Sequence, residues 1–141
     1  TQAANSSVAT ALPTLNLPQT FTVPTANGQI TLAADALGTG SVARTVVIST
    51  SGGSLSATGL GTGVGAGITA TGSVTNAGTI TLSGTEQALS AYLAAAGNLV
   101  FNGNVGSYTL TIKAQAYSAG QLVGQTVKTA AVTAAVVPVL G

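Results

Sequence analysis

The feature that most constrains the fold is the segment from Ser83 to Ala116, in which two hydrophobic periodicities follow one another. Its first part has the i, i+3, i+4, i+7 spacing of one helical face, carried by Leu89, Tyr92, Leu93 and Ala96. Ser83 and Glu86 have the spacing of a capping box, and Gly97 is typical of a helix end. The pattern predicts one short helix at about residues 85–96.

In the second part of this segment the period changes to two. The apolar positions, which alternate with polar ones, are Tyr108, Leu110, Ile112, Ala114 and Ala116. This alternation predicts a strand with one buried face. Further alternating or β-branched runs lie at residues 15–23, 29–33, 42–49, 79–82 and 121–137. Because glycine- and asparagine-containing turns separate them, we expect an all-β fold, a β-sandwich of seven or eight strands with one short helix.

Charged side chains are unusually rare in this sequence. They make up 4% of the residues, against about 25% in an average domain, while 45% of the residues are hydrophobic and 23 are threonine. Disorder requires low hydrophobicity, so this composition favours a folded β protein. The net charge of +1 provides no electrostatic footprint for nucleic acid. The absence of cysteine excludes disulfides and zinc–thiolate sites.

The five charged side chains offer little catalytic chemistry. They are Asp35, Arg44, Glu86, Lys113 and Lys128. Without histidine no Ser-His-Asp triad can form, and a Ser–Lys dyad would need a lysine from the polar face of a strand. A carboxylate pair would need Asp35, which lies in a polar turn, and Glu86, which has a capping position. Two carboxylates are also too few for calcium, which takes about six to eight oxygen ligands. We expect no catalytic, metal or cofactor site.

Glycine occurs at every second position from Gly59 to Gly67, and residues 61–66 overlap a loose dinucleotide-binding fingerprint. That fingerprint requires a helix immediately after it, to direct backbone amides at a pyrophosphate. The strand-forming residues 68–71 follow instead. The run therefore predicts a hairpin or a closely packed strand.

Two covalent modifications are compatible with the residues. Asn5 begins an N-x-S/T sequon and is a candidate glycosylation site. An isopeptide bond would join Lys113 or Lys128 to an asparagine with Glu86 as the assisting carboxyl group, and the candidate asparagines are Asn98, Asn102 and Asn104. The sequence does not show that these groups meet.

The helix–strand segment also carries a family resemblance. Its matching positions are Leu82, Gly84, Thr85, Leu89, Leu93, Leu99, Phe101, Gly106, Leu110 and Ile112. With LPTLNLPQTFTVP and GQITLAADAL near the start and GGSLSATG further on, they resemble the cadherin-like, immunoglobulin-like repeats of large bacterial surface proteins (adhesins and exoproteins). The resemblance spans about Leu12 to Val137 and implies an immunoglobulin/cadherin-like β-sandwich at the cell surface. Unlike many relatives, this chain has no Asp-rich calcium motif.

Both ends of the chain are more apolar than exposed tails usually are. The candidate assembly residues are Leu15, Leu17, Phe21 and Val23 near one end and Val132, Val136, Val137 and Val139 near the other. We expect residues 1–12 to be an N-terminal linker or exchanged segment, 13–137 a single β-sandwich domain and 138–141 a C-terminal tail. Two interpretations remain open: the end segments form the first and last strands of one sandwich, or one of them completes the sheet of a neighbouring copy.

These features predict a structural, non-enzymatic protein that is extracellular and lies at the cell surface. Its expected partners are other copies of itself, in a filament or sheet, or neighbouring repeats of the same chain. We expect no membrane insertion, because the apolar run at residues 130–140 is shorter than the ~20 residues of a membrane span and contains a proline. The alternative is a spacer or a glycan- or host-binding repeat of a giant adhesin in cell adhesion and biofilm, for which Tyr117 is the tyrosine outside the apolar faces.

Overall fold

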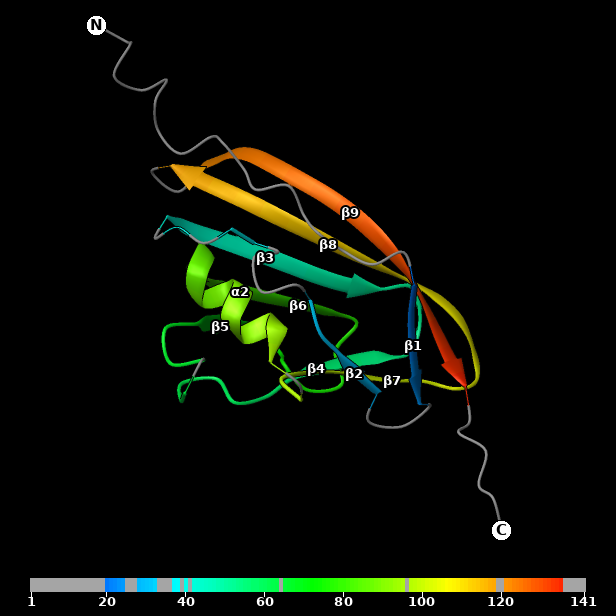
Figure 1. Ribbon diagram of the computed structural model, residues 1–141. Coiled ribbons are helices and arrows are strands. Elements are labelled where there is room, and N and C mark those ends of the chain that lie inside the picture. Colours follow the sequence, from blue (N-terminus) through cyan, green and yellow to red (C-terminus); the bar gives the residue numbers. More distant parts are fainter. Residues whose placement is uncertain are drawn as a thin grey trace, which may run out of the picture.

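The computed structural model describes residues 20–24, 28–32, 37–38, 40, 42–63, 65–95, 97–118 and 121–135. Within them lie nine strands and one helix (Figure 1). The elements are β1 (Thr20–Pro24), β2 (Gly28–Ile30), β3 (Ala43–Thr50), β4 (Ser54–Ala57), β5 (Thr69–Thr71), β6 (Thr79–Thr85), α2 (Glu86–Ala94), β7 (Leu99–Asn102), β8 (Gly106–Ser118) and β9 (Gln121–Ala135). The all-β prediction is confirmed, while the expected number of seven or eight strands was too low.

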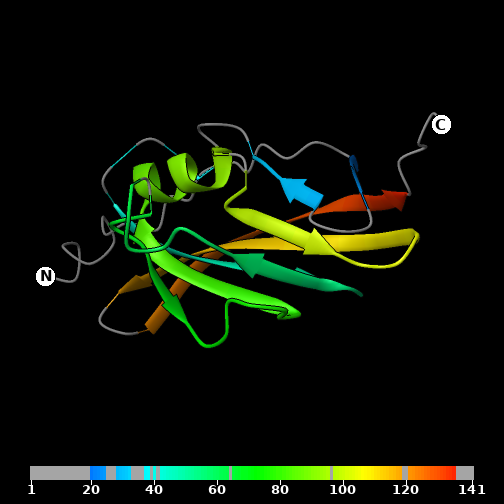
Figure 2. The ribbon, with the colours of Figure 1, turned by 90° about the horizontal axis from the view of Figure 1, so that it is seen from below.

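The strands form two sheets. The larger sheet has six strands in the order β1-β9-β8-β3-β6-β5, and the smaller has three in the order β2-β7-β4. The smaller sheet and α2 lie on the same face of the larger sheet, as the two perpendicular views show (Figures 1 and 2). The result is a two-layer arrangement in which α2 extends the layer of the smaller sheet.

The core lies between these two layers. Strand alternation turns every second side chain of the larger sheet toward it, as in Val46 and Ile48 of β3. The smaller sheet contributes Leu55, Leu99 and Phe101, which have no exposed surface. At roughly 1.5–3 kcal/mol for each large apolar side chain, burial is the main stabilising term. The alternation in residues 108–116 predicted the inner face of β8 correctly.

The short helix was predicted with bounds that are too wide and with the wrong cap. It spans Glu86–Ala94, and the residue that caps it is Thr85, whose Oγ1 accepts a hydrogen bond from the Ala88 N–H at 3.1 Å. Ser83 is still part of β6, where its hydroxyl lies 3.2 Å from that of Thr45. The capping-box spacing was misleading because β6 continues to Thr85 and the helix begins at Glu86, so Thr85 and not Ser83 occupies the cap position.

The glycine-rich stretch forms tight turns ahead of β5. Gly59, Gly61 and Gly63 have positive φ angles of 73°, 84° and 53°, which side chains with a Cβ rarely adopt. A side chain at Gly65 would collide with the backbone carbonyl of Gly59. The strand that was expected after this stretch is present as β5.

Candidate assembly site and buried polar cluster

Three of the candidate assembly residues lie in the core of a single chain. β1 pairs with β9 in parallel, with Phe21 beside Val132 and Val23 beside Ala134. Phe21 is 9% exposed, Val23 3% and Val132 0%. The other candidates lie outside the described residues: Leu15, Leu17, Val136, Val137 and Val139, together with the sequon at Asn5.

The structure therefore brings the first and last described strands together within one chain. Within the described residues, β1 and β9 are neighbouring strands of one sheet, and the choice between the two interpretations of the end segments stays a prediction. Sequence periodicity could not show this pairing. Alternation fixes which side chains share a face, but a parallel pairing between strands about 110 residues apart depends on the topology of the whole sheet.

The longest open sheet edge among the described strands belongs to β9. β1 lies beside only the last five residues of β9, Ala131–Ala135, so that Gln121–Ala130 have no described strand on that side. The edge of β4 is covered instead, because Leu55 and Ala77 exchange backbone hydrogen bonds of 2.7 and 2.9 Å. A long open edge is a template for pairing with another segment.

Threonine and serine dominate the outer face of the larger sheet. In one row across the sheet, Thr111 of β8 lies beside Ser49 on one side and Thr129 on the other. Gln115 donates from its amide to the side-chain oxygen of Gln125 at 2.8 Å. Hydroxyl and amide groups thus keep this face polar with little charge.

The two lysines differ in position. Lys113 lies on the outer face between Val47 and Val127, as the sequence predicted. Lys128 does not lie on the outer face. Its register partner is the buried Ile112, so alternation places Lys128 on the same face as the core. Lys128 is nevertheless exposed, and no described strand lies on the outer side of β9 at this position. An inward-facing charge is one of the devices that limit uncontrolled pairing at an edge.

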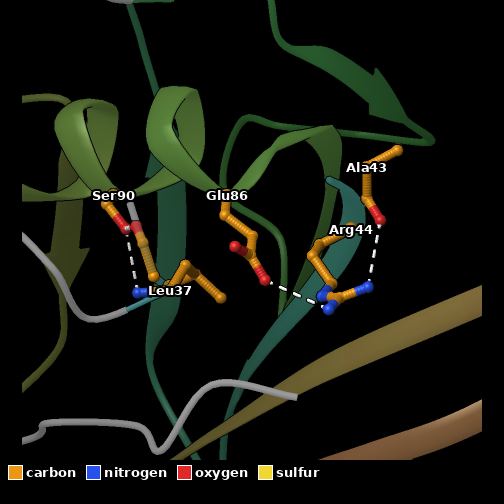
Figure 3. A network of polar contacts seen from close by, with 6 residues as sticks. Leu37, Ala43, Arg44, Glu86 and Ser90 are labelled. Atoms are coloured by element: carbon orange, nitrogen blue, oxygen red, sulfur yellow. Dashed lines mark hydrogen bonds and ion pairs between the residues drawn. The ribbon is translucent and has the colours of Figure 1, made fainter. Parts of the chain in front are cut away.

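A buried ion pair joins β3 to the start of α2 (Figure 3). Arg44 Nη2 lies 3.1 Å from Glu86 Oε2, and the two side chains are 2% and 12% exposed. Arg44 also donates from Nη1 to the Ala43 carbonyl at 3.5 Å. From the sequence, Arg44 had no predicted role and Glu86 was predicted to cap the helix. Their contact was not predicted, because the two residues are far apart in the chain.

Hydrogen bonds hold Leu37, Gly38 and Val42, which precede β3, against the first turns of the helix. The Glu86 N–H donates to the Val42 carbonyl at 2.9 Å. Figure 3 shows the second contact, in which the Ser90 hydroxyl accepts from the Leu37 N–H at 2.9 Å. The same hydroxyl donates to the Gly38 carbonyl at 2.7 Å. A Cβ added at Gly38 would lie 2.9 Å from Glu86 Oε1, so glycine there leaves room for the carboxylate.

The Glu86 carboxylate contacts a guanidinium group, and its candidate acid–base partner Asp35 lies outside the described residues. A surface hollow beside the pair is lined by Ala43, Arg44, Thr45, Ser83 and Gly84. Of the isopeptide candidates, Asn98 donates its amide hydrogen to the Tyr92 carbonyl at 3.1 Å. No group of three or more His, Cys, Asp or Glu side chains occurs within the described ranges.

The tyrosines give a glycan-binding site little support. Tyr92 has no exposed surface, and the ring centre of Tyr108 lies 5.2 Å from that of Phe101. The side chain of Tyr117 lies outside what the structure describes. No helix among the described residues combines the length and apolarity needed to cross a membrane.

Comparisons with models of known protein families, with curated proteins and with solved structures find no match to this chain.

Proposed function

We propose that this chain is a load-bearing structural module of an extracellular surface polymer, with an immunoglobulin/cadherin-like sandwich fold. It would act as a subunit of a self-assembling filament or sheet, or as a spacer repeat of a long adhesin. Strand exchange through an apolar terminus would join one copy to the next. The resemblance noted in the sequence supports the location at the cell surface.

The order of the strands supports the immunoglobulin-like type. In that fold the strands C, F and G are neighbours in one sheet, and B, E and D are neighbours in the other. Taking β2, β3 and β4 as B, C and D and β7, β8 and β9 as E, F and G gives the observed neighbours β3-β8-β9 and β2-β7-β4. In this assignment β5 and β6 are additional strands next to strand C, which is β3.

The observation that carries the load-bearing role is the parallel pairing of β1 with β9. The chain enters β1 at Thr20, beside Ala131, and leaves β9 at Ala135, beside Pro24. Tension between these two points pulls the strands past each other, so the hydrogen bonds between them are loaded together. An antiparallel pair pulled from adjacent ends would instead open one bond at a time.

Pulling experiments on single molecules test this role. Because the chain has no cysteine, handles can be attached through introduced ones. We expect a higher unfolding force when the handles are placed at Thr20→Cys and Ala135→Cys than when they are placed at Pro24→Cys and Ala135→Cys. Pro24 and Ala135 are register partners at the same end of the two strands. Pulling on this pair therefore separates β1 from β9 starting at that end. Equal forces in the two geometries would contradict the load-bearing role.

Electron microscopy tests the polymer. At micromolar concentration we expect the purified chain to form filaments or sheets, and we would compare it with a variant that lacks residues 1–18. Assemblies that disappear with the deletion identify the N-terminal segment as the exchanged one, and assemblies that persist point to residues 136–140. Monodisperse monomers from both chains would overturn self-assembly and leave a repeat of a longer adhesin.

A further inference from the structure

The larger sheet keeps one face outside the two-layer core. The helix α2 and the smaller sheet both lie on its other face (Figures 1 and 2). Strand alternation directs every second side chain of the six strands to this outer face. Thr22 of β1, Thr129 of β9 and Thr71 of β5 are all exposed there. The outer face is therefore open to solvent from one edge of the sheet to the other.

Charge is nearly absent from this outer face. Among the described strand residues, the charged side chain that lies on it is Lys113, because Arg44 is buried and Lys128 is in phase with the core. The surface of a soluble domain usually carries roughly 25–35% charged residues, whereas the centre of a protein interface is depleted of them. Removing water from this face therefore requires the desolvation of little charge.

The middle of the outer face contains an apolar row. Val47 of β3 and Val127 of β9 lie on either side of Lys113 of β8. Val127 is 49% exposed, and the aliphatic stem of a lysine can cover apolar neighbours while its ammonium group stays in water. The next row is polar and includes Thr111 and Thr129. An apolar centre beside polar groups is the usual arrangement of a protein interface.

The size and shape of the outer face fit a second sheet. Six strands about 4.8 Å apart, over the eight residues of β3 at about 3.3 Å each, present a face of roughly 600 Å². The smallest specific protein interfaces bury about 600 Å² on each partner. Because strands twist with one hand, the surface that follows a twisted sheet best is another twisted sheet, packed about 10 Å away at about −30°. A second copy of this chain supplies such a sheet.

We propose that the outer face of the larger sheet binds the same face of a second copy, so that two chains pack sheet to sheet about a two-fold axis. The inference rests on the proposed function, in which copies of the chain are the partners, and it names the surface through which neighbouring filaments associate sideways. Strand exchange at a terminus joins copies along a filament and is a separate contact. Two faces that each carry one lysine among hydroxyl and methyl groups bring few like charges together.

Added charge tests this interface. The test variant Thr81→Lys/Thr129→Lys places two further charges on the outer face. The control variant Gln29→Lys/Gln87→Lys adds the same charge at exposed positions of β2 and α2, in the opposite layer. In sedimentation of the full chain from micromolar to millimolar concentration, we expect the Kd of the dimer to rise at least about tenfold in the test variant and less than about twofold in the control. Circular dichroism and urea unfolding check that each variant is folded.

Lys113→Met is a second variant that acts in the opposite direction. It removes the charge from the middle of the outer face and keeps an unbranched side chain there. Because no ammonium group has to be desolvated or brought near its copy, we expect the Kd of the dimer to fall about threefold or more. A loss of folding cannot produce this result, since it would weaken association in every variant.

Electron microscopy of the same variants separates this interface from the polymer. We expect filaments of the unmodified chain and of the control to lie side by side, and those of the test variant to be single. If no filaments form, the polymer fails, while dimers that dissociate in the test variant still support the interface. Paired filaments or dimers that persist unchanged in the test variant would overturn it. An unmodified chain that stays monomeric at millimolar concentration and forms no paired filaments would also overturn it, and would leave the face to a partner of other chemistry, such as a polysaccharide.

Discussion

Replacing Glu86 with glutamine is expected to lower the free energy of unfolding by about 3–5 kcal/mol. Arg44 would stay buried while it lost the carboxylate that lies 3.1 Å from its guanidinium group. Arg44→Met alone should also be strongly destabilising, because the Glu86 carboxylate is only 12% exposed. Urea unfolding followed by circular dichroism measures both effects, and an unchanged slope with denaturant shows that the fold itself is retained.

The double variant Arg44→Met/Glu86→Leu separates the ion pair from the packing. Because apolar replacement of a whole buried pair is often neutral or stabilising, we expect it to recover most of the loss seen in either single variant. Lys113→Gln is the matched control: it removes one charge from the outer face of β8 and should change stability by no more than about 0.5 kcal/mol. A loss below about 1 kcal/mol for Glu86→Gln would show that water reaches the pair.

This ion pair shows what sequence reasoning missed and why. Arg44 lies in the β-branched run at residues 42–49, for which no buried face was predicted, although its position in phase with Val46 and Ile48 could have been noticed. The contact with Glu86 could not have been predicted, because Glu86 is more than forty residues away and reaches β3 only through the pairing of β3 with β6. A charged residue in phase with Val46 and Ile48 was the available signal for a buried charge.

The fold was predictable where the pattern is local. The alternation of residues 108–116 and the helical spacing of Leu89, Tyr92 and Leu93 correspond to β8 and to the buried face of α2. Short strands such as β2 and β5, three residues each, have too few positions for a period to be recognised. Their existence depends on neighbouring strands that supply hydrogen bonds, which is tertiary information.

Alkaline pH is expected to destabilise this protein through Tyr92. Burial raises the pKa of its hydroxyl from 10.0 to about 12, and the side chain has no exposed surface. Between these two values the unfolded chain has released the proton while the folded chain still holds it, so the free energy of unfolding falls as pH rises. The stabilisation is fully present below pH 10 and its loss approaches roughly 3 kcal/mol by pH 12.

Tyr92→Phe isolates this effect from other groups that titrate in alkali. The Tyr92 hydroxyl donates to the carbonyl of Thr58 at 2.5 Å and lies 3.2 Å from that of Asn98, so its removal should cost about 1–3 kcal/mol at neutral pH. The phenylalanine variant has no proton to lose at this position. The free energy of unfolding of the tyrosine protein minus that of the phenylalanine variant is measured by urea unfolding from pH 8 to 12. It should fall by about 1.4 kcal/mol for each pH unit above 10. A constant difference across that range would mean that the Tyr92 hydroxyl titrates in the folded protein as it does in the unfolded chain.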